Sequence, residues 1–146
     1  MERVNAVYAC IVNEKKQVLL VHNRDADQWS LPGGKVEDGE TLEETAKREC
    51  REEISARIKV NDILFVRDYI GKNHEFAEWD SEDHQIEYMF DCEIIDNTEI
   101  KNGETPDNMQ IGISWINLNE LKEYRIYPKI LKEYISEKGI IKDKTY

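Results

Sequence analysis

Three glutamates in the first half of the chain have the residue type and the spacing that metal chemistry requires. Glu49, Glu52 and Glu53 stand at positions i, i+3 and i+4. In a helix this spacing brings the three carboxylates to one face, with β-carbons roughly 5–6 Å apart. Magnesium prefers oxygen ligands and usually bridges one or two carboxylates to substrate phosphates. The same pattern is also typical of a solvated helix face crossed by salt bridges, so the spacing alone leaves both readings open.

The element that must position these carboxylates is a helix predicted over Thr41–Ile54. Thr41 can cap the first turn, and Glu44 stands three residues later, which completes a capping box. Apolar residues recur at every fourth position and predict the buried stripe of the helix: Leu42, Ala46, Cys50 and Ile54. The glutamates are therefore expected on a rigid element that packs on a core.

A glycine-rich segment leads into this helix. It contains the pair Gly33-Gly34 and a further glycine, Gly39, just before the predicted N-cap. Glycine allows positive φ and a close approach of the backbone to a ligand. Such a turn can offer backbone amides and carbonyls to a phosphate or a metal ion.

The stretch from Gly34 to Ala56 resembles the signature of the Nudix hydrolases. Seven positions carry the resemblance: Gly34, Glu40, Arg48, Glu49, Cys50, Glu52 and Glu53. The segments 18–21, 29–34 and 115–121 also look like the family. Two positions depart, because Ser55 and Ala56 stand where the family has glycine and a larger aliphatic residue. Glycine there ends the helix in a left-handed conformation, and serine is expected to do so at a cost of about 1 kcal/mol.

The resemblance implies an α/β fold of the α+β kind, an α/β/α sandwich with a mixed sheet. It implies a pyrophosphohydrolase in which water attacks a phosphorus of a nucleoside diphosphate linked to a group X. The expected cofactor is Mg²⁺ or Mn²⁺, which would neutralise the diphosphate and lower the pKa of bound water. The expected substrate is a small nucleotide: a nucleoside triphosphate, a damaged nucleotide or a nucleotide sugar.

The resemblance also implies roles for individual residues. Glu49, Glu52 and Glu53 bind the metal, with the carbonyl of Gly34 as an additional ligand. Arg48 holds the glutamates in place by ion pairing and counts among the catalytic residues, with Glu40 in support. Either Glu53 or Glu49 is the base that takes a proton from the attacking water.

Further substrate contacts are proposed in and around the loops. Arg24 and Lys35 are the cations nearest the glycine turn, and are either phosphate ligands or solvated surface residues. Phe76 and Trp79 lie in a long acidic loop and either stack on a base or cover the edge of the core. Asp107 is either a second base or a turn former beside proline.

Alternation and turn residues predict the remaining elements. Strands are expected at 4–12, 17–22, 58–69, 85–95 and 110–118, with the first two forming a hairpin. Residues 29–34 are expected to be irregular, and two short helices are expected after Asn119, the second opened by Pro128. Trp115 is expected in the core. No break in composition suggests a boundary, so residues 1–146 are predicted to form one domain, as a monomer or a homodimer.

Composition narrows the partners and the compartment. The net charge of −11 disfavours a polynucleotide partner, because nucleic-acid binding needs a basic surface. No stretch approaches the ~20 apolar residues that span a membrane, and a secretory signal is not expected. Three scattered cysteines argue against a disulfide framework and fit a reducing cytoplasm, with buried thiols.

Two other functions compete with the small-nucleotide hydrolase. A Nudix-like sensor would bind a nucleotide without turnover, although three metal-binding carboxylates are superfluous for that task. A pyrophosphohydrolase acting on RNA 5′ ends is disfavoured by the negative charge and the absence of a basic stripe.

Overall fold

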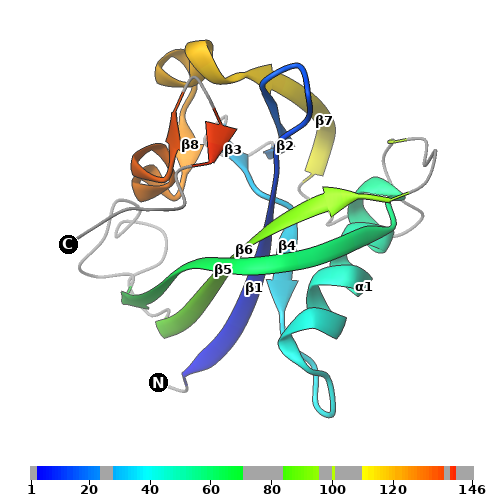
Figure 1. Cartoon of the computed structure of the whole chain (residues 1–146). Helices are drawn as coiled ribbons and strands as arrows, with labels where there is room; N and C mark the ends of the chain where they lie inside the picture. Colours follow the sequence, from blue (N-terminus) through cyan, green and yellow to red (C-terminus); the bar gives the residue numbers. More distant parts are fainter. Residues whose placement is uncertain are drawn as a thin grey trace.

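Two four-stranded sheets and one α-helix make up most of the computed structural model, which describes residues 3–23, 28–70, 84–95, 100, 110–136 and 139–140. In chain order the elements are β1 Val4–Ile11, β2 Gln17–Asn23, β3 Gln28–Ser30, β4 Gly33–Lys35, α1 Leu42–Ile54, β5 Ile58–Ile70, β6 His84–Ile94, β7 Gln110–Asn117, η3 Leu118–Glu123, β8 Ile126–Tyr127, η4 Lys129–Glu133, β9 Ile135–Ser136 and β10 Gly139–Ile140. Figure 1 shows their arrangement. The α+β class expected from the sequence is confirmed.

The first sheet has the order β4-β1-β6-β5 and is mixed. β1 pairs with β6 in parallel and with β4 in antiparallel orientation, while β5 and β6 form a long antiparallel pair. β1 can hold the central place because Ala6, Val7, Ala9, Cys10 and Ile11 are all buried, so both of its faces are covered.

The second sheet has the order β7-β2-β3-β8, and it shows that the predicted hairpin is wrong. β1 and β2 share only the bridge between Val12 and Val18 beside the turn, where the Asn13 N–H donates to the Gln17 carbonyl at 2.9 Å. Beyond that bridge the strands part into different sheets. β2 is buried on both faces from Val18 to Val21. Its two edges pair with β7 and β3 rather than with β1, the preceding strand in the sequence.

Helix α1 begins and ends as the sequence predicts. The Thr41 side chain accepts from the Glu44 N–H at 3.1 Å, and the Glu44 carboxylate accepts from the Thr41 N–H at 3.0 Å. At the other end Ser55 adopts the left-handed conformation, with φ of 56°. The predicted stripe is buried at Ala46, Cys50 and Ile54, and Leu42 is half-buried.

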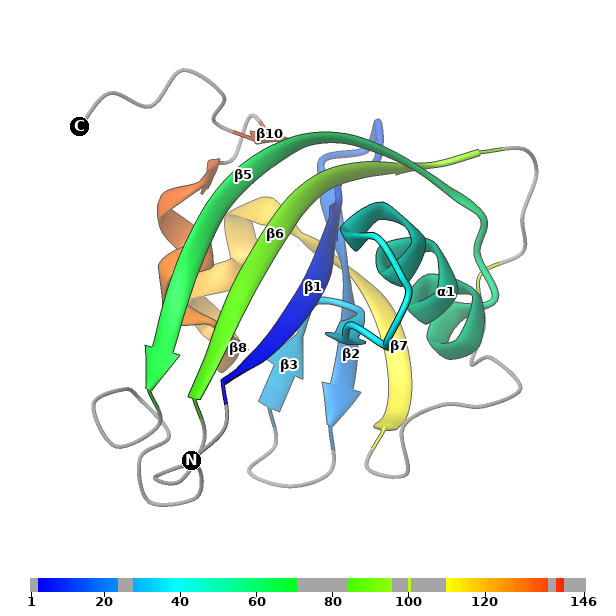
Figure 2. The same ribbon diagram turned by 90° about the horizontal axis from the view of Figure 1, so that it is seen from below.

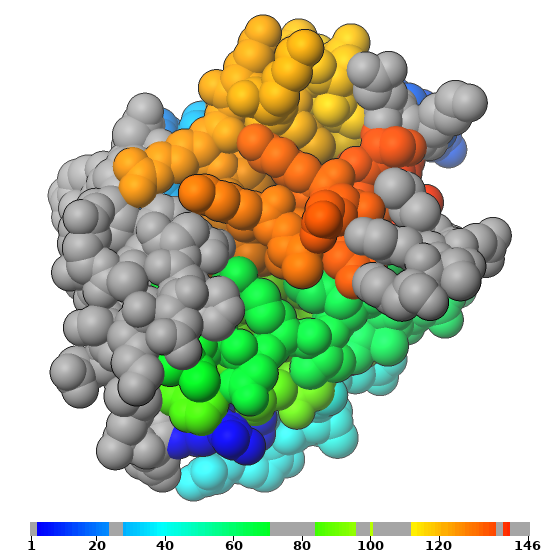
Figure 3. Space-filling view, turned by 90° about the vertical axis from the view of Figure 1, so that its left-hand side faces the viewer, coloured from blue at the N-terminus to red at the C-terminus, as the bar shows by residue number. Residues whose placement is uncertain are grey.

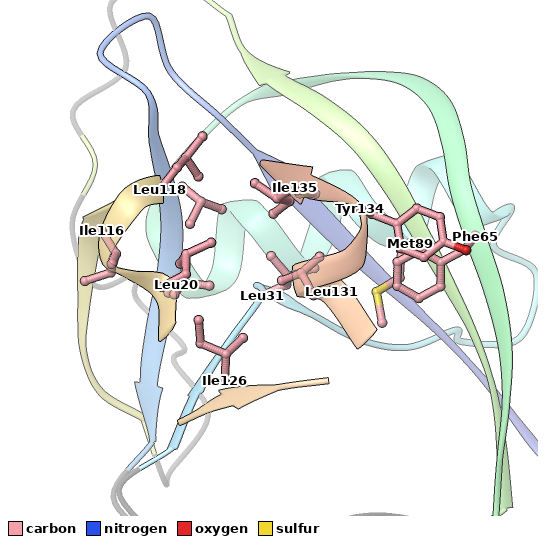
Figure 4. Close-up of a cluster of buried hydrophobic side chains, with 13 residues drawn as sticks. Leu20, Leu31, Phe65, Met89, Ile116, Leu118, Ile126, Leu131, Tyr134 and Ile135 are labelled. Carbon is pink, nitrogen blue, oxygen red and sulfur yellow. The ribbon is translucent and has the colours of Figure 1, made fainter. Parts of the chain in front are cut away.

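Two apolar clusters hold the layers together. One joins α1 to β1, β2 and the Ala56–Ile58 segment, and it includes Cys50 and Cys92. The other joins the opposite face of β1 and β2 to the C-terminal segments, as Figure 4 shows for Leu20, Met89 and Leu131. Figure 2 shows α1 and the C-terminal turns on opposite sides of the first sheet. All three cysteines are buried and free, as expected.

The C-terminal helices and the segment before α1 differ in detail from expectation. The two short helices are single 3₁₀ segments, η3 and η4, and Pro128 stands at the N-terminus of the second. The prediction that segment 29–34 is irregular was wrong, because the segment contributes to β3, which pairs with β2 and β8, and to β4, which pairs with β1. Trp115 is half-buried.

The C-terminal segments lie directly against β5, as Figure 3 shows. The rings of Phe65 and Tyr134 stack there with centroids 4.3 Å apart. Within the described ranges, no helix is both long and apolar enough to cross a bilayer.

Ser55 offers a direct test of the helix end. Replacing it with glycine should raise the free energy of unfolding by about 1 kcal/mol, because glycine adopts positive φ without the clash of a β-carbon. Urea denaturation monitored by circular dichroism measures the change. The matched variant Ser55→Ala keeps the β-carbon and should give no gain, so equal stabilisation by both changes would contradict this account.

Candidate functional site

The three glutamates of α1 border one surface depression of about 470 Å³. Its floor and walls come from β1, β4, β6, α1 and the turn after β4, namely Tyr8, Gly33, Gly34, Lys35, Glu37, Glu49, Glu52, Glu53 and Gln85. The structure thus brings carboxylates and glycines together because β4 pairs with β1 and packs beside α1 (Figure 1). A strongly negative hollow with a glycine edge results.

Arg48 is the charge at the centre of the acidic cluster. Its Nε donates to Glu40 Oε2 at 2.7 Å and its Nη2 to Glu40 Oε1 at 3.0 Å, which makes a two-pronged pair. Its Nη1 donates to Glu49 at 3.0 Å and to Glu52 at 3.2 Å. A further bond runs from Nη2 to the carbonyl of Lys35 at 3.0 Å. The hydrogen bond to Glu40 is the main reason that the pKa of Arg48 is raised.

Arg48 therefore fixes two of the three carboxylates and ties the helix to β4. It also offsets the like-charge repulsion that i, i+3 and i+4 glutamates otherwise exert. Its side chain is mostly buried, so the ion pairs are less screened than surface pairs.

Of the three glutamates Glu49, Glu52 and Glu53, the first and the last are the more withdrawn from solvent. Glu53 is only 8% exposed, and the Gly33 N–H donates to its Oε2 at 3.0 Å. Burial raises the pKa of Glu49, and Arg48 opposes that effect by favouring the charged form. Both carboxylates are thus partly desolvated in the depression.

Gly34 is packed against the Glu49 carboxylate. A β-carbon at this position would lie 2.5 Å from Glu49 Oε1 and 2.7 Å from its carboxyl carbon. A side chain here would displace the Glu49 carboxylate, so the observed position of that carboxylate depends on glycine at position 34.

The donor set suits a hard cation, although the described side chains do not form a finished cage. No three His, Cys, Asp or Glu side chains of the described part converge tightly enough to enclose an ion by themselves. The oxygens available are carboxylates plus backbone carbonyls, which is the donor chemistry of magnesium rather than of zinc. Magnesium keeps several waters and shares its shell with substrate phosphates, so an incomplete protein cage fits it.

A second cavity opens beside the depression, between the two sheets. Its volume is about 180 Å³ and its lining is Tyr8, Val21, Asn23, Gln28, Ser30, Leu31, Gly33, Glu53 and Tyr127. Tyr8, Gly33 and Glu53 line both hollows, so the two adjoin at the buried end of the carboxylate cluster.

A family profile described as a NUDIX domain matches residues 2–135 of the chain. The chain belongs to the Nudix hydrolase family. The resemblance seen in the sequence is confirmed, and the Nudix signature is the segment that forms the depression described above.

Curated Nudix relatives agree with this assignment. A nucleoside triphosphatase NudI from Salmonella heidelberg (strain SL476) is 34% identical over 72% of this chain and 74% of its own length. A putative 8-oxo-dGTP diphosphatase from Bacillus subtilis (strain 168) is 44% identical over 36% of this chain. That match spans 40% of the Bacillus protein, and a match to putative nudix hydrolase 1 of Caenorhabditis elegans spans 32% of that protein.

Solved Nudix structures share the fold. A MutT protein from Methanosarcina mazei Go1 superposes with a TM-score of 0.66 at 27% identity, covering 90% of this chain and 88% of that one. A NUDIX hydrolase from Nitrosomonas europaea reaches a TM-score of 0.71 at 15% identity, covering 90% and 85%. The low identity of the second match shows that the fold persists while most of the sequence changes.

The structure locates most of the predicted residues of the Nudix signature. Gly34, Glu49, Glu52 and Glu53 border the depression, and Arg48 with Glu40 lies behind them, bonded to two of the glutamates. Lys35 is exposed at the rim. The proposed substrate residues Arg24, Phe76, Trp79 and Asp107 lie outside the described residues.

Several lining residues were missed by sequence reasoning. Tyr8 and Gln85 stand in strands whose alternation indicates core or surface, and nothing in their spacing points to a site. Tyr127 stands beside Pro128 in the C-terminal segment, and it joins the cavity only because β8 pairs with β3. Long-range strand pairing, which one sequence does not display, puts them there.

Gly34 provides a test of the packing between β4 and α1. Gly34→Ala should lower turnover by about 100-fold, because the new methyl group displaces the Glu49 carboxylate and small misplacements at a catalytic site are costly. Steady-state assays and urea denaturation measure both properties. Gly112→Ala is the matched control, since a β-carbon there meets no atom within 4 Å. Equal activity losses in both variants would contradict the assigned role of Gly34.

The lowered pKa of Glu40 makes the stability of the protein depend on pH in the acid range. The Arg48 hydrogen bonds, with further bonds from the Glu37 N–H and Thr45, lower the pKa of Glu40 to about 2. In the unfolded chain a glutamate titrates near about 4.3. Because the folded pKa is the lower one, the stabilisation is complete above about pH 4.3 and is lost as the pH falls through about 2.

The stability difference between the wild type and Glu40→Gln should therefore be constant at neutral pH and shrink below about pH 4. Urea denaturation at a series of pH values measures it. A difference that stays unchanged down to about pH 2.5 would refute the lowered pKa.

Proposed function

We propose that the chain hydrolyses a diphosphate linkage in a small nucleotide, with Mg²⁺ or Mn²⁺ as cofactor. The observation that carries the proposal is the convergence of Glu49, Glu52 and Glu53 on one depression edged by Gly34. A salt-bridged surface helix would not need its carboxylates withdrawn from solvent. Here Glu53 is buried and Glu49 is mostly so, which costs hydration and indicates a site.

The residues that would hold the metal are Glu49, Glu52 and Glu53, with the carbonyl of Gly34 in addition. When bound, the ion supplies charge neutralisation for the diphosphate and a lowered pKa for the attacking water. Arg48 orients Glu49 and Glu52, and Glu40 holds Arg48 through its two-pronged pair. Lys35 at the rim is placed to attract the phosphate chain.

Two carboxylates remain candidates for the base. Glu49 is mostly withdrawn from solvent, and Glu53 is buried where the two hollows adjoin. Separate Glu49→Gln and Glu53→Gln variants distinguish them. Because both residues are also proposed metal ligands, each variant should weaken Mg²⁺ binding measured by calorimetry, but the variant of the base should lose turnover even at saturating Mg²⁺.

The substrate we favour is a nucleoside triphosphate, including oxidised forms. Two relatives support this choice, a nucleoside triphosphatase and a putative 8-oxo-dGTP diphosphatase. The net charge of −11 disfavours an RNA end as substrate. Three buried free thiols support work in a reducing compartment, the cytoplasm.

The decisive variants are Glu52→Gln and Glu53→Gln. Each should lower Mg²⁺-dependent release of nucleoside monophosphate at least ~100-fold, because a neutral amide is a poor ligand for a hard cation. Turnover of a nucleotide panel and thermal unfolding are measured together. Glu43→Gln is the matched control: Glu43 lies on the same helix in an exposed pair with Lys47 at 3.7 Å, and the change should leave turnover unaltered.

Turnover in Glu52→Gln and Glu53→Gln that is comparable with that of the wild type would refute the metal assignment. A folded wild-type protein that turns over no nucleotide with either Mg²⁺ or Mn²⁺ would refute the hydrolase and favour a sensor. Chelation should abolish turnover, and added Mg²⁺ should restore it.

A further inference from the structure

A buried ion pair lies beneath the cavity between the sheets. Glu87 on β6 is fully buried, and Arg67 on β5 binds its Oε1 with Nε at 2.8 Å and Nη2 at 2.8 Å. The two residues are direct cross-strand partners. Burying an ionised pair seldom adds net stability compared with apolar packing, so such pairs suggest another role.

Tyr127 connects this pair to the cavity. Its hydroxyl donates to Glu87 Oε2 at 2.6 Å, and its side chain lines the cavity beside Tyr8. Burial first, and then the charge of Glu87, raises the pKa of Tyr127, so the phenol keeps its proton. The ring is held by Arg67, 5.1 Å from its centroid, and by an edge contact with Tyr69 at 5.9 Å.

The direction of this hydrogen bond has a chemical consequence. A phenol has one proton, and Tyr127 gives it to Glu87, so toward any other group its oxygen can act only as an acceptor. Donation to a carboxylate also makes the phenol oxygen a stronger acceptor, because hydrogen bonds in a chain polarise one another.

The cavity favours an uncharged part of a ligand. Among its described lining residues Glu53 alone carries a charge, and Glu53 stands at the junction with the depression. The other polar groups are neutral: Asn23, Gln28 and Ser30, with the Asn23 amide donating to Ser30 Oγ at 2.9 Å. Phosphates would stay in the depression, where the proposed divalent cation neutralises them, while a neutral ring can enter the cavity.

We propose that Glu87 and Arg67 position Tyr127 as a hydrogen-bond acceptor in this cavity, which consequently selects nucleotides whose base carries an exocyclic amino group. The inference rests on the proposed function for the nature of the ligand. The amino group is the donor that projects farthest from a base, and it meets the Tyr127 oxygen. Glu87 and Arg67 are positioning residues, since they act through Tyr127.

Binding of nucleoside monophosphates tests the inference without any turnover. Two pairs of compounds differ by one amino group: AMP and purine riboside monophosphate, and GMP and IMP. In calorimetric titrations the wild type should bind the amino compound of at least one pair about 5-fold more tightly or better, the effect of one hydrogen bond. Tyr127→Phe should reduce this preference to less than about 2-fold.

Two further variants distinguish a role of Glu87 in positioning Tyr127 from a role in packing alone. Tyr124→Phe is the matched control, because Tyr124 packs edge-on against Trp29 and does not line the cavity; it should keep the preference. Glu87→Gln should lower the preference more than the overall affinity, since an amide can donate to Tyr127 and reverse the hydrogen bond. A merely structural role of Glu87 would weaken all four ligands equally.

Equal binding within both pairs, a preference that survives Tyr127→Phe, or no binding of any of the four compounds would overturn the proposal. Turnover of nucleoside triphosphates is assayed separately. Loss of turnover with an intact amino preference would count against the hydrolase alone, and turnover without the preference would count against the Tyr127 assignment alone.

Discussion

The site depends on keeping several carboxylates close together, and Arg48 is the group that makes this possible. One guanidinium bonds Glu40, Glu49 and Glu52 and also reaches the backbone of β4 through the carbonyl of Lys35. Its rigid fork suits several carboxylates at once, which the point charge of a lysine does not. Without it, α1 would carry adjacent like charges with little to hold their orientation.

Close backbone packing is the second condition, and it links the fold to the site. β4 can approach α1 because Gly34 has no β-carbon to strike Glu49, and β4 is itself held by pairing with β1. The Gly33 N–H then reaches Glu53. The glycine pair thus lets one strand serve as a sheet edge and as a wall of the depression.

Local features of the site could be predicted from the sequence, because helix periodicity and capping operate within a few residues. The Thr41 cap, the left-handed Ser55 and the shared face of the glutamates all belong to this class. The hairpin prediction failed because it treated sequence neighbours as spatial neighbours. The cavity was missed for the same reason: Tyr127 meets Glu87 across 40 residues, and only the paired strands bring them together.

The depression and the neighbouring cavity differ in the charge of their lining residues. The depression carries the acidic cluster, and under the proposed function a divalent cation there would neutralise an approaching phosphate chain. The neighbouring cavity is lined by neutral groups, and the charge of Glu87 is kept behind them and compensated by Arg67. A buried ion pair gives little net stability, but here it fixes the direction of a hydrogen bond, because the Tyr127 hydroxyl donates its proton to Glu87. If the proposed roles hold, base selectivity depends on Tyr127 in the C-terminal segment and metal binding on α1, so the two properties can change independently.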